Sequence, residues 1–133
     1  MAIRVSVSRV DMDDKTLQKP VLKDYGETRI AENSSTAYTI DLTRGNVYEV
    51  TLTASCTFTF SNPPASGTAG SFTLILKQDA TGSRGVTWPT SVQWENGSAP
   101  VITGTASATD ILTFTTTNGG TAWYGFLSGL AFA

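Results

Sequence analysis

Residues 110–129 read DILTFTTTNGGTAWYGFLSG, and they contain the clearest structural signal in the chain. Apolar residues alternate with threonines through much of 110–117, which is the period of a half-buried β-strand. A second strand-like run follows at 121–129, and the NGG at 118–120 between the two runs is a strong signal for a tight turn. The sequence therefore predicts an antiparallel hairpin, and with it a domain built from strands.

The same alternation continues upstream of this hairpin. Residues 36–42 and 47–54 each place apolar side chains on one face, and the RGN turn at 44–46 predicts that they form a second hairpin. Further short strands are expected at 55–60, 71–77, 86–88, 91–94 and 101–106. No stretch has convincing helical periodicity. The sequence thus predicts an all-β fold, a single β-sandwich or jelly-roll-like domain over residues 33–133.

Residues 1–32 differ from the rest of the chain in charge. They carry 12 of the 20 charged side chains, and the other 101 residues carry 8. The segment at 3–10 alternates as a strand does, whereas DMDDKTLQKP at 11–20 is polar. We expect an extended N-terminal arm that is weakly ordered alone and becomes ordered on a partner. The residues expected to make that contact are Ile3, Arg4, Val5, Val7, Arg9, Asp11, Asp13, Asp14 and Lys15.

The composition argues against several kinds of active site. The chain has no histidine, which is the commonest general base and the commonest metal ligand. Its one cysteine, Cys56, lies in phase with Phe58 and is expected in the core. The acidic run at 11–14 does not continue as a calcium loop, because Thr16 and Leu22 stand where glycine and glutamate are needed. We therefore expect no catalytic residue, no metal and no cofactor, and a protein that is not an enzyme.

Charge and hydropathy also argue against some partners. The net charge of −2 argues against a basic surface that holds nucleic acid. No run approaches the roughly 20 apolar residues of a membrane span. The first residues contain no apolar segment of the kind found in a signal peptide. We expect synthesis in a cytoplasm, with neither nucleic acid nor a membrane as a partner.

A second stretch, GSRGVTWPTSVQW at 82–94, contains two of the three tryptophans around one proline. Exposed indoles there would form a platform for sugar rings, but each indole shares its strand phase with a valine two residues earlier. This favours the core or a subunit contact. Trp123 and Tyr124 are neighbours on one strand and face opposite ways. The candidates for subunit contact or ligand stacking are Trp88, Trp94, Tyr124, Phe126 and Phe132.

Several short motifs together resemble a known family. They are LILKQDATGSR, VTWP, a second tryptophan before a glycine-containing turn, ILTF and WYGF. Over about residues 34–133 the chain is similar to a β-rich module of tailed-phage virion proteins. The module resembles both the C-terminal modules of tail fibres and small capsid decoration proteins. The resemblance implies a homotrimer of β-sandwich domains without enzymatic activity.

The segment in front of the module separates two functional hypotheses. No collagen-like or heptad shaft precedes it, which favours a compact decoration (cement) protein over a fibre. On this hypothesis the homotrimer binds the major capsid protein at the capsid exterior, through its arms, and stabilises the head of the virion. The alternative is a receptor-binding module of a tail fibre or head fibre, whose ligand is a host-surface glycan. Both hypotheses place synthesis in the host cytoplasm.

Overall fold

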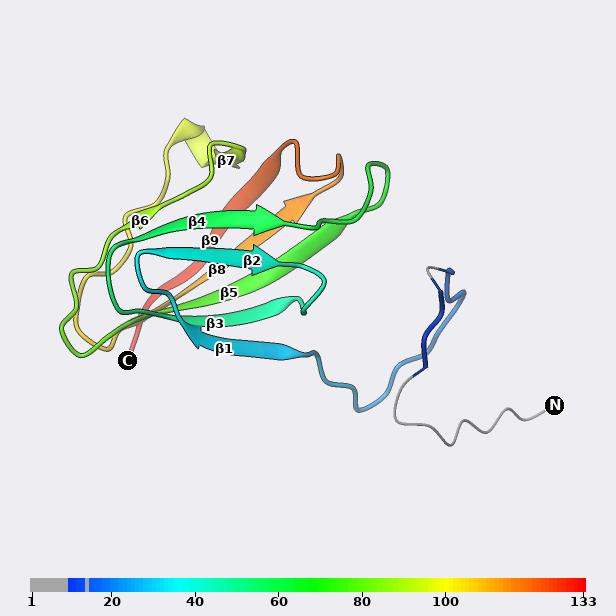
Figure 1. Cartoon of the computed structure of the whole chain (residues 1–133), viewed down its shortest axis with the longest axis horizontal. Coiled ribbons are helices and arrows are strands. Elements are labelled where there is room, and N and C mark those ends of the chain that lie inside the picture. The colour runs from blue at the N-terminus through cyan, green and yellow to red at the C-terminus, as the bar shows by residue number, and fades with distance from the viewer. Residues whose placement is uncertain (1–9, 14) are drawn as a thin grey trace.

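The computed structural model describes residues 10–13 and 15–133. Within them the chain forms nine strands and one short 3-10 helix (Figure 1). The all-β fold that the sequence predicts is confirmed. The elements are β1 (Arg29–Asn33), β2 (Ala37–Asp41), β3 (Val47–Leu52), β4 (Cys56–Ser61), β5 (Gly70–Gln78), β6 (Val86–Thr87), β7 (Val92–Trp94), η1 (Glu95–Gly97), β8 (Thr109–Thr116) and β9 (Trp123–Phe132).

The strands form two sheets, and the chain alternates between them from β1 to β7, after which β8 and β9 stay in the large sheet. The large sheet has six strands in the order β1-β3-β5-β8-β9-β7, and the small sheet has three in the order β2-β4-β6. Strands β1, β3 and β5 pair parallel, as do β2, β4 and β6, because each return to a sheet passes through the other sheet. A jelly roll pairs its strands antiparallel. The coarser description, two sheets around one core, is what the structure supports.

The hairpin predicted at 110–129 is confirmed. Strands β8 and β9 pair antiparallel, with Thr115 opposite Tyr124 and Thr113 opposite Phe126. The buried hydroxyl of Thr116 closes the turn, because it donates to the carbonyl of Ala122 at 2.7 Å. Both glycines of the turn, at 119 and 120, have positive φ angles, a conformation that glycine adopts at low cost.

The hairpin predicted between 36–42 and 47–54 is wrong. Strands β2 and β3 lie in different sheets, so the turn at 44–46 crosses from one layer to the other. Each strand does bury one face, as the alternation predicts, but the two buried faces meet across the core. Gly45 is needed at this crossing, since a Cβ there would lie 2.6 Å from Cδ1 of Ile30 and 2.8 Å from the carbonyl oxygen of Thr28.

The short strand predicted at 101–106 is also wrong. The backbone of this segment bonds to side chains and loops instead of to a neighbouring strand. The amide of Thr103 donates to Oδ2 of Asp110 at 2.7 Å, and its carbonyl accepts from Nε2 of Gln78 at 2.9 Å. The carbonyl of Gly104 accepts from the amide of Ser83 at 2.7 Å. Buried polar side chains therefore satisfy the backbone hydrogen-bonding groups of this loop. The alternation of apolar residues in the sequence had predicted a strand there.

The core lies between the two sheets and is rich in aromatic rings. Phe60 of the small sheet contacts Phe72 and Phe114 of the large sheet at centroid distances of 4.9 and 5.0 Å. Cys56 is 2% exposed, so the predicted core position of its thiol is confirmed, and burial raises the pKa of that thiol. Each fully buried large apolar side chain contributes roughly 1.5–3 kcal/mol to folding.

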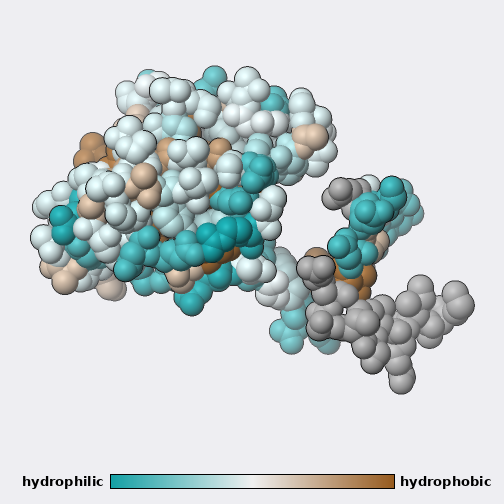
Figure 2. All heavy atoms as spheres, viewed as in Figure 1, coloured by the Kyte–Doolittle hydropathy of each residue, from teal (hydrophilic) through white to brown (hydrophobic). Residues whose placement is uncertain are grey.

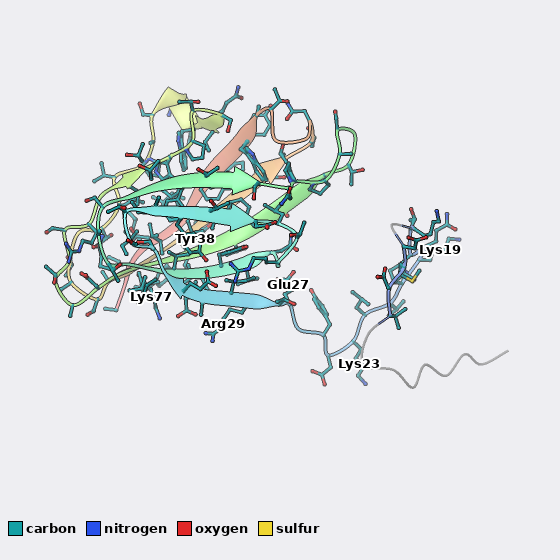
Figure 3. All side chains as sticks on the ribbon, in the orientation of Figure 1. Lys19, Lys23, Glu27, Arg29, Tyr38 and Lys77 are labelled. Carbon is teal, nitrogen blue, oxygen red and sulfur yellow. The ribbon has the colours of Figure 1, made fainter. Side chains whose placement is uncertain are left out.

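The segment before β1 runs away from the sheets. Every described residue from 10 to 28 is exposed, and Lys19 and Lys23 lie along this extension (Figure 3). Strand β1 belongs to the large sheet, although the sequence placed its first four residues, 29–32, in the arm. Of the predicted contact residues of the arm, Asp11, Asp13 and Lys15 are exposed. Those at 3–9 and 14 lie outside the described residues.

Candidate functional site

Two adjacent hollows open at the edge of the large sheet where β7 ends. Their volumes are about 330 and 340 Å³, near the lower bound of the roughly 300–1,000 Å³ range of ligand sites. Both are lined by Trp94, Glu95, Gly125 and Phe126, and together we call them the β7–β9 groove. The remaining lining residues are Asn96, Ser98, Pro100 and Leu127 in the first hollow and Gln93 and Tyr124 in the second.

The short length of β7 creates this groove. Strand β7 pairs parallel with β9 over three residues, and its last pair joins Trp94 to Gly125. The chain then turns away through η1, so no described strand covers that edge of β9 from Phe126 onward. In the turn, Asn96 and Gly97 have positive φ angles of 55° and 73°. Asparagine and glycine are the residues that best tolerate this conformation.

Gly125 brings the indole of Trp94 close to β9. A Cβ at position 125 would lie 2.6 Å from Cζ3 of the indole and 2.8 Å from Cε3. Any larger residue would therefore displace the ring. Because Gly125 has no Cβ, the six-membered ring of the indole lies directly against the strand and forms a wall of the groove.

Other aromatic rings support the indole from the core side. Its centroid lies 5.4 Å from that of Trp88 and 5.6 Å from that of Phe114. Trp88 in turn stacks on Phe58 at 5.5 Å with an interplanar angle of 19°. Such contacts fix the position of the rings, each pair contributing about 0.5–1.5 kcal/mol beyond burial. Trp94 is thus a rigid, half-buried wall.

Two further rings in the groove are exposed to solvent. Tyr124 is 49% exposed and Phe126 is 55% exposed, although both are held on the backbone of a paired strand. Because they are two residues apart, the two side chains lie on the same face of β9, and adjacent exposed apolar side chains often mark an interaction site. Their rigid placement on β9 costs little conformational entropy when a ligand packs against them.

The polar side chains of the groove make no hydrogen bond to any described residue. They are Gln93, Glu95, Asn96, Ser98 and Tyr124. Elsewhere in the domain, amides serve the fold: Asn46 donates to the carbonyl of Ser71, and Gln78 bonds to Arg84 and Thr103. The donors and acceptors of the groove are therefore free to bind a ligand.

The groove is also without positive charge. Glu95 is its one charged lining residue among the described part of the chain. All nine lysines and arginines lie in residues 1–84, and those of the sheets pair with carboxylates, as Lys77 does with Glu49 and Arg84 with Asp79. These partners lower the pKa of Glu49 and of Asp79. Figure 2 shows the strongest hydrophilic colour on the side of the domain where β1 lies.

The structure separates the aromatic candidates that the sequence had grouped. Trp94, Tyr124 and Phe126 all line the β7–β9 groove, but from two faces of β9. Tyr124 and Phe126 point away from the core, whereas the indole of Trp94 lies on the core side at Gly125. Trp88 lies behind that indole and lines neither hollow. Phe132 lies at the other end of β9, where its ring packs near Gly129. The sequence reasoning missed the polar lining residues, which are Gln93, Glu95, Asn96 and Ser98. Their signal was the polar ENGS turn directly after the second tryptophan.

The part of the chain that the structure describes holds neither a metal-binding cluster nor a membrane-spanning helix. It holds no group of three or more acidic, histidine or cysteine side chains placed to bind a metal. Among the same residues, no helix has the length and apolar character needed to cross a membrane.

Comparison with known families identifies the class of protein. The profile of the family described as "Putative phage tail fibre C-terminal domain" matches residues 36–122, which is more than half of the chain. The chain belongs to this family. It is a β-rich structural module of a phage virion. No curated protein and no solved structure matches the chain. The matched range ends just before β9, so the family assignment does not extend to Tyr124 and Phe126.

Proposed function

We propose that this chain is a receptor-binding module of a phage virion and that the β7–β9 groove binds a glycan of the host surface. The observation that carries the proposal is the pair of exposed rings, Tyr124 and Phe126, on one face of β9, beside polar side chains that have no hydrogen-bond partner among the described residues. A sugar ring presents an apolar face and a rim of hydroxyls. Aromatic rings pack against the face, and amides and carboxylates bond to the hydroxyls.

Membership of a tail fibre family supports this function. A module that contacts the host binds a molecule on the bacterial surface, and glycans are exposed there. The groove suits such a ligand because its walls are rigid and its rim is polar. The assignment needs no catalytic group, which agrees with a binding role.

Removing one ring tests the groove directly. We expect Phe126→Ala to weaken glycan binding by about 1 kcal/mol, or roughly fivefold, because the stacking surface is lost. The measurement is binding to an array of bacterial surface polysaccharides, followed by titration of the best ligand with intrinsic tryptophan fluorescence. Tyr25→Ala is the control, since Tyr25 is an aromatic residue that is 68% exposed and lies outside both the groove and the proposed subunit contact.

The two variants separate the possible outcomes. Equal loss in Phe126→Ala and Tyr25→Ala would show that the loss does not depend on the groove. An array on which the wild-type protein binds no glycan would overturn the proposed function.

We also propose that the module assembles as a homotrimer. The end of β9 supports this, because Leu130 and Phe132 are 44% and 50% exposed on a strand without a charged residue. Exposed apolar edge strands are normally covered in a functional assembly. A second copy of the chain is the proposed occupant.

A second candidate function is capsid decoration, and the arm is the observation that favours it. The described residues from 10 to 28 are all exposed and include Leu17, Val21 and Tyr25, which are 60–95% exposed. An arm of this kind suits attachment to the major capsid protein. An electron microscopy map of the phage distinguishes the candidates, since density for the chain on the head supports decoration and density at a fibre tip supports receptor binding.

A further inference from the structure

The charge and shape of the β7–β9 groove carry an inference about its ligand. We infer that the groove selects an uncharged oligosaccharide, and that its two hollows are adjoining subsites for two consecutive sugar rings. This inference rests on the proposed glycan-binding function and specifies the class of glycan. Acidic glycans, which carry uronic acids, sialic acids or phosphates, are excluded.

The exclusion follows from the residues that line the groove. Arginine and lysine are the side chains that best neutralise the charge of an acidic sugar, and neither hollow contains one. Glu95 lines both hollows, so a sugar carboxylate in either subsite would approach a like charge. The only other charged residue after Arg84 is Asp110, which is also acidic.

The pair of subsites follows from how the hollows share their walls. Trp94 and Phe126 border both, and each hollow has its own amide, Gln93 in one and Asn96 in the other. One hollow lies beside Tyr124 and the other beside Leu127, further along β9. Gln93 and Tyr124 point from one face of the sheet, and the indole of Trp94 lies on the other. A ligand that fills both hollows therefore passes around the uncovered edge of β9 beside Phe126, with one ring against each amide.

Matched sugars test the charge rule. The probes are disaccharides of glucose, galactose and N-acetylglucosamine, each paired with the uronic acid that differs from it by one carboxylate. We expect the neutral member to bind at least about fivefold more tightly at low salt, because two like charges within about 4 Å repel even in water. The difference should shrink as salt is added.

Glu95→Gln identifies the residue responsible. This variant should bring the affinity ratio of each pair close to one, because it removes the like charge from both hollows. Glu27→Gln, an equal change in net charge on the exposed segment before β1, should leave the ratio unchanged. An unchanged ratio in Glu95→Gln would overturn the inference.

Chain length tests the paired subsites. A neutral disaccharide should bind more tightly than its methyl monosaccharide, and both Gln93→Ala and Asn96→Gly should remove that gain. Glycine preserves the positive φ at position 96, so the second variant deletes only the amide. Acidic sugars that bind as tightly as neutral ones would overturn this inference and leave glycan binding standing. Failure of every sugar to bind would overturn the proposed function itself.

Discussion

Glu32, at the end of β1, connects three parts of the fold. Its carboxylate accepts hydrogen bonds from the hydroxyl of Tyr38 on β2 and from the guanidinium of Arg44, which precedes β3. The bonds from Arg44 and Tyr38 lower the pKa of Glu32 from 4.5 to about 2. The ion pair between Glu32 and Arg44 is partly exposed, so solvent screens it. Its contribution to stability is therefore better judged from the pH dependence of unfolding than from its geometry.

The pKa of Glu32 predicts how stability depends on pH. A carboxyl whose pKa is lower in the folded state stabilises the fold above its unfolded value and loses that contribution as pH falls. The contribution of Glu32 should be complete above about pH 4.5 and disappear as pH falls towards 2. Glu32→Gln should therefore lower the melting temperature at pH 7 and approach the wild type at pH 2.

Thermal unfolding between pH 2 and pH 7 measures this prediction. Asp41, Glu49 and Asp79 also have lowered pKa values, so the wild-type protein loses stability in acid for several reasons. The difference between variant and wild type isolates the part due to Glu32. Glu27→Gln should follow the wild-type curve, and a Glu32→Gln curve parallel to the wild type would contradict the assignment.

At the scale of residues, the sequence predicted whether a side chain is buried better than it predicted what that side chain does. Cys56 alternates in step with Phe58, which correctly predicted that it is buried, because successive side chains on a strand point to opposite faces. The phase of Trp94 gave an inward face as well, and the structure adds that this ring is only half buried. Its exposure depends on where β7 ends and on the absence of a Cβ at Gly125. Such three-dimensional features leave no periodic signal.

At the scale of elements, strands were predictable and their partners were not. The runs at 71–77 and 110–117 became β5 and β8 with shifts of one residue. Residues 36–42 and 47–54 became β2 and β3, yet they joined different sheets. A short turn between two alternating strands fits both a hairpin and a crossing between layers, since each strand buries one face in either arrangement. The NGG turn was decisive because its geometry favours the hairpin alone.

Gly45 is the residue that makes the crossing between β2 and β3 possible. A methyl group there would meet Cδ1 of Ile30 and the backbone oxygen of Thr28, and the backbone cannot move away without shifting β1. We expect Gly45→Ala to destabilise the domain by about 1–3 kcal/mol, as overpacking does. Hydrogen exchange should accelerate first in β1, which pairs only with β3.

A matched glycine controls for the effect of the substitution itself. Gly26 lies two residues before Thr28, and a Cβ added there would have no atom within 4 Å, so Gly26→Ala should leave stability and exchange unchanged. Chemical denaturation gives the free energy of unfolding, and mass spectrometry of exchanged peptides gives the protection of residues 29–33. Equal behaviour of the two variants would show that the approach of Gly45 to β1 is unimportant.

At the scale of the molecule, the arm and the groove lie at opposite edges of one sheet. The arm leads into β1 and the groove adjoins β7, which are the two outer strands of the large sheet (Figure 1). With strands about 4.8 Å apart, five intervals separate these edges by roughly 24 Å. The domain can therefore be held to a particle through its arm while the groove faces outward.

Removing the arm tests this separation of attachment from binding. We expect the chain without residues 1–20 to keep its melting temperature and its affinity for glycans, because the described residues of that segment are exposed and distant from the groove. Light scattering should give a homotrimer for both proteins, since the proposed contact surface is on β9. Incorporation into phage particles, measured by complementing a deletion phage, should fall strongly in the truncated protein alone. If truncated protein enters particles as well as the full chain does, attachment belongs to the domain, and the exposed arm requires another explanation.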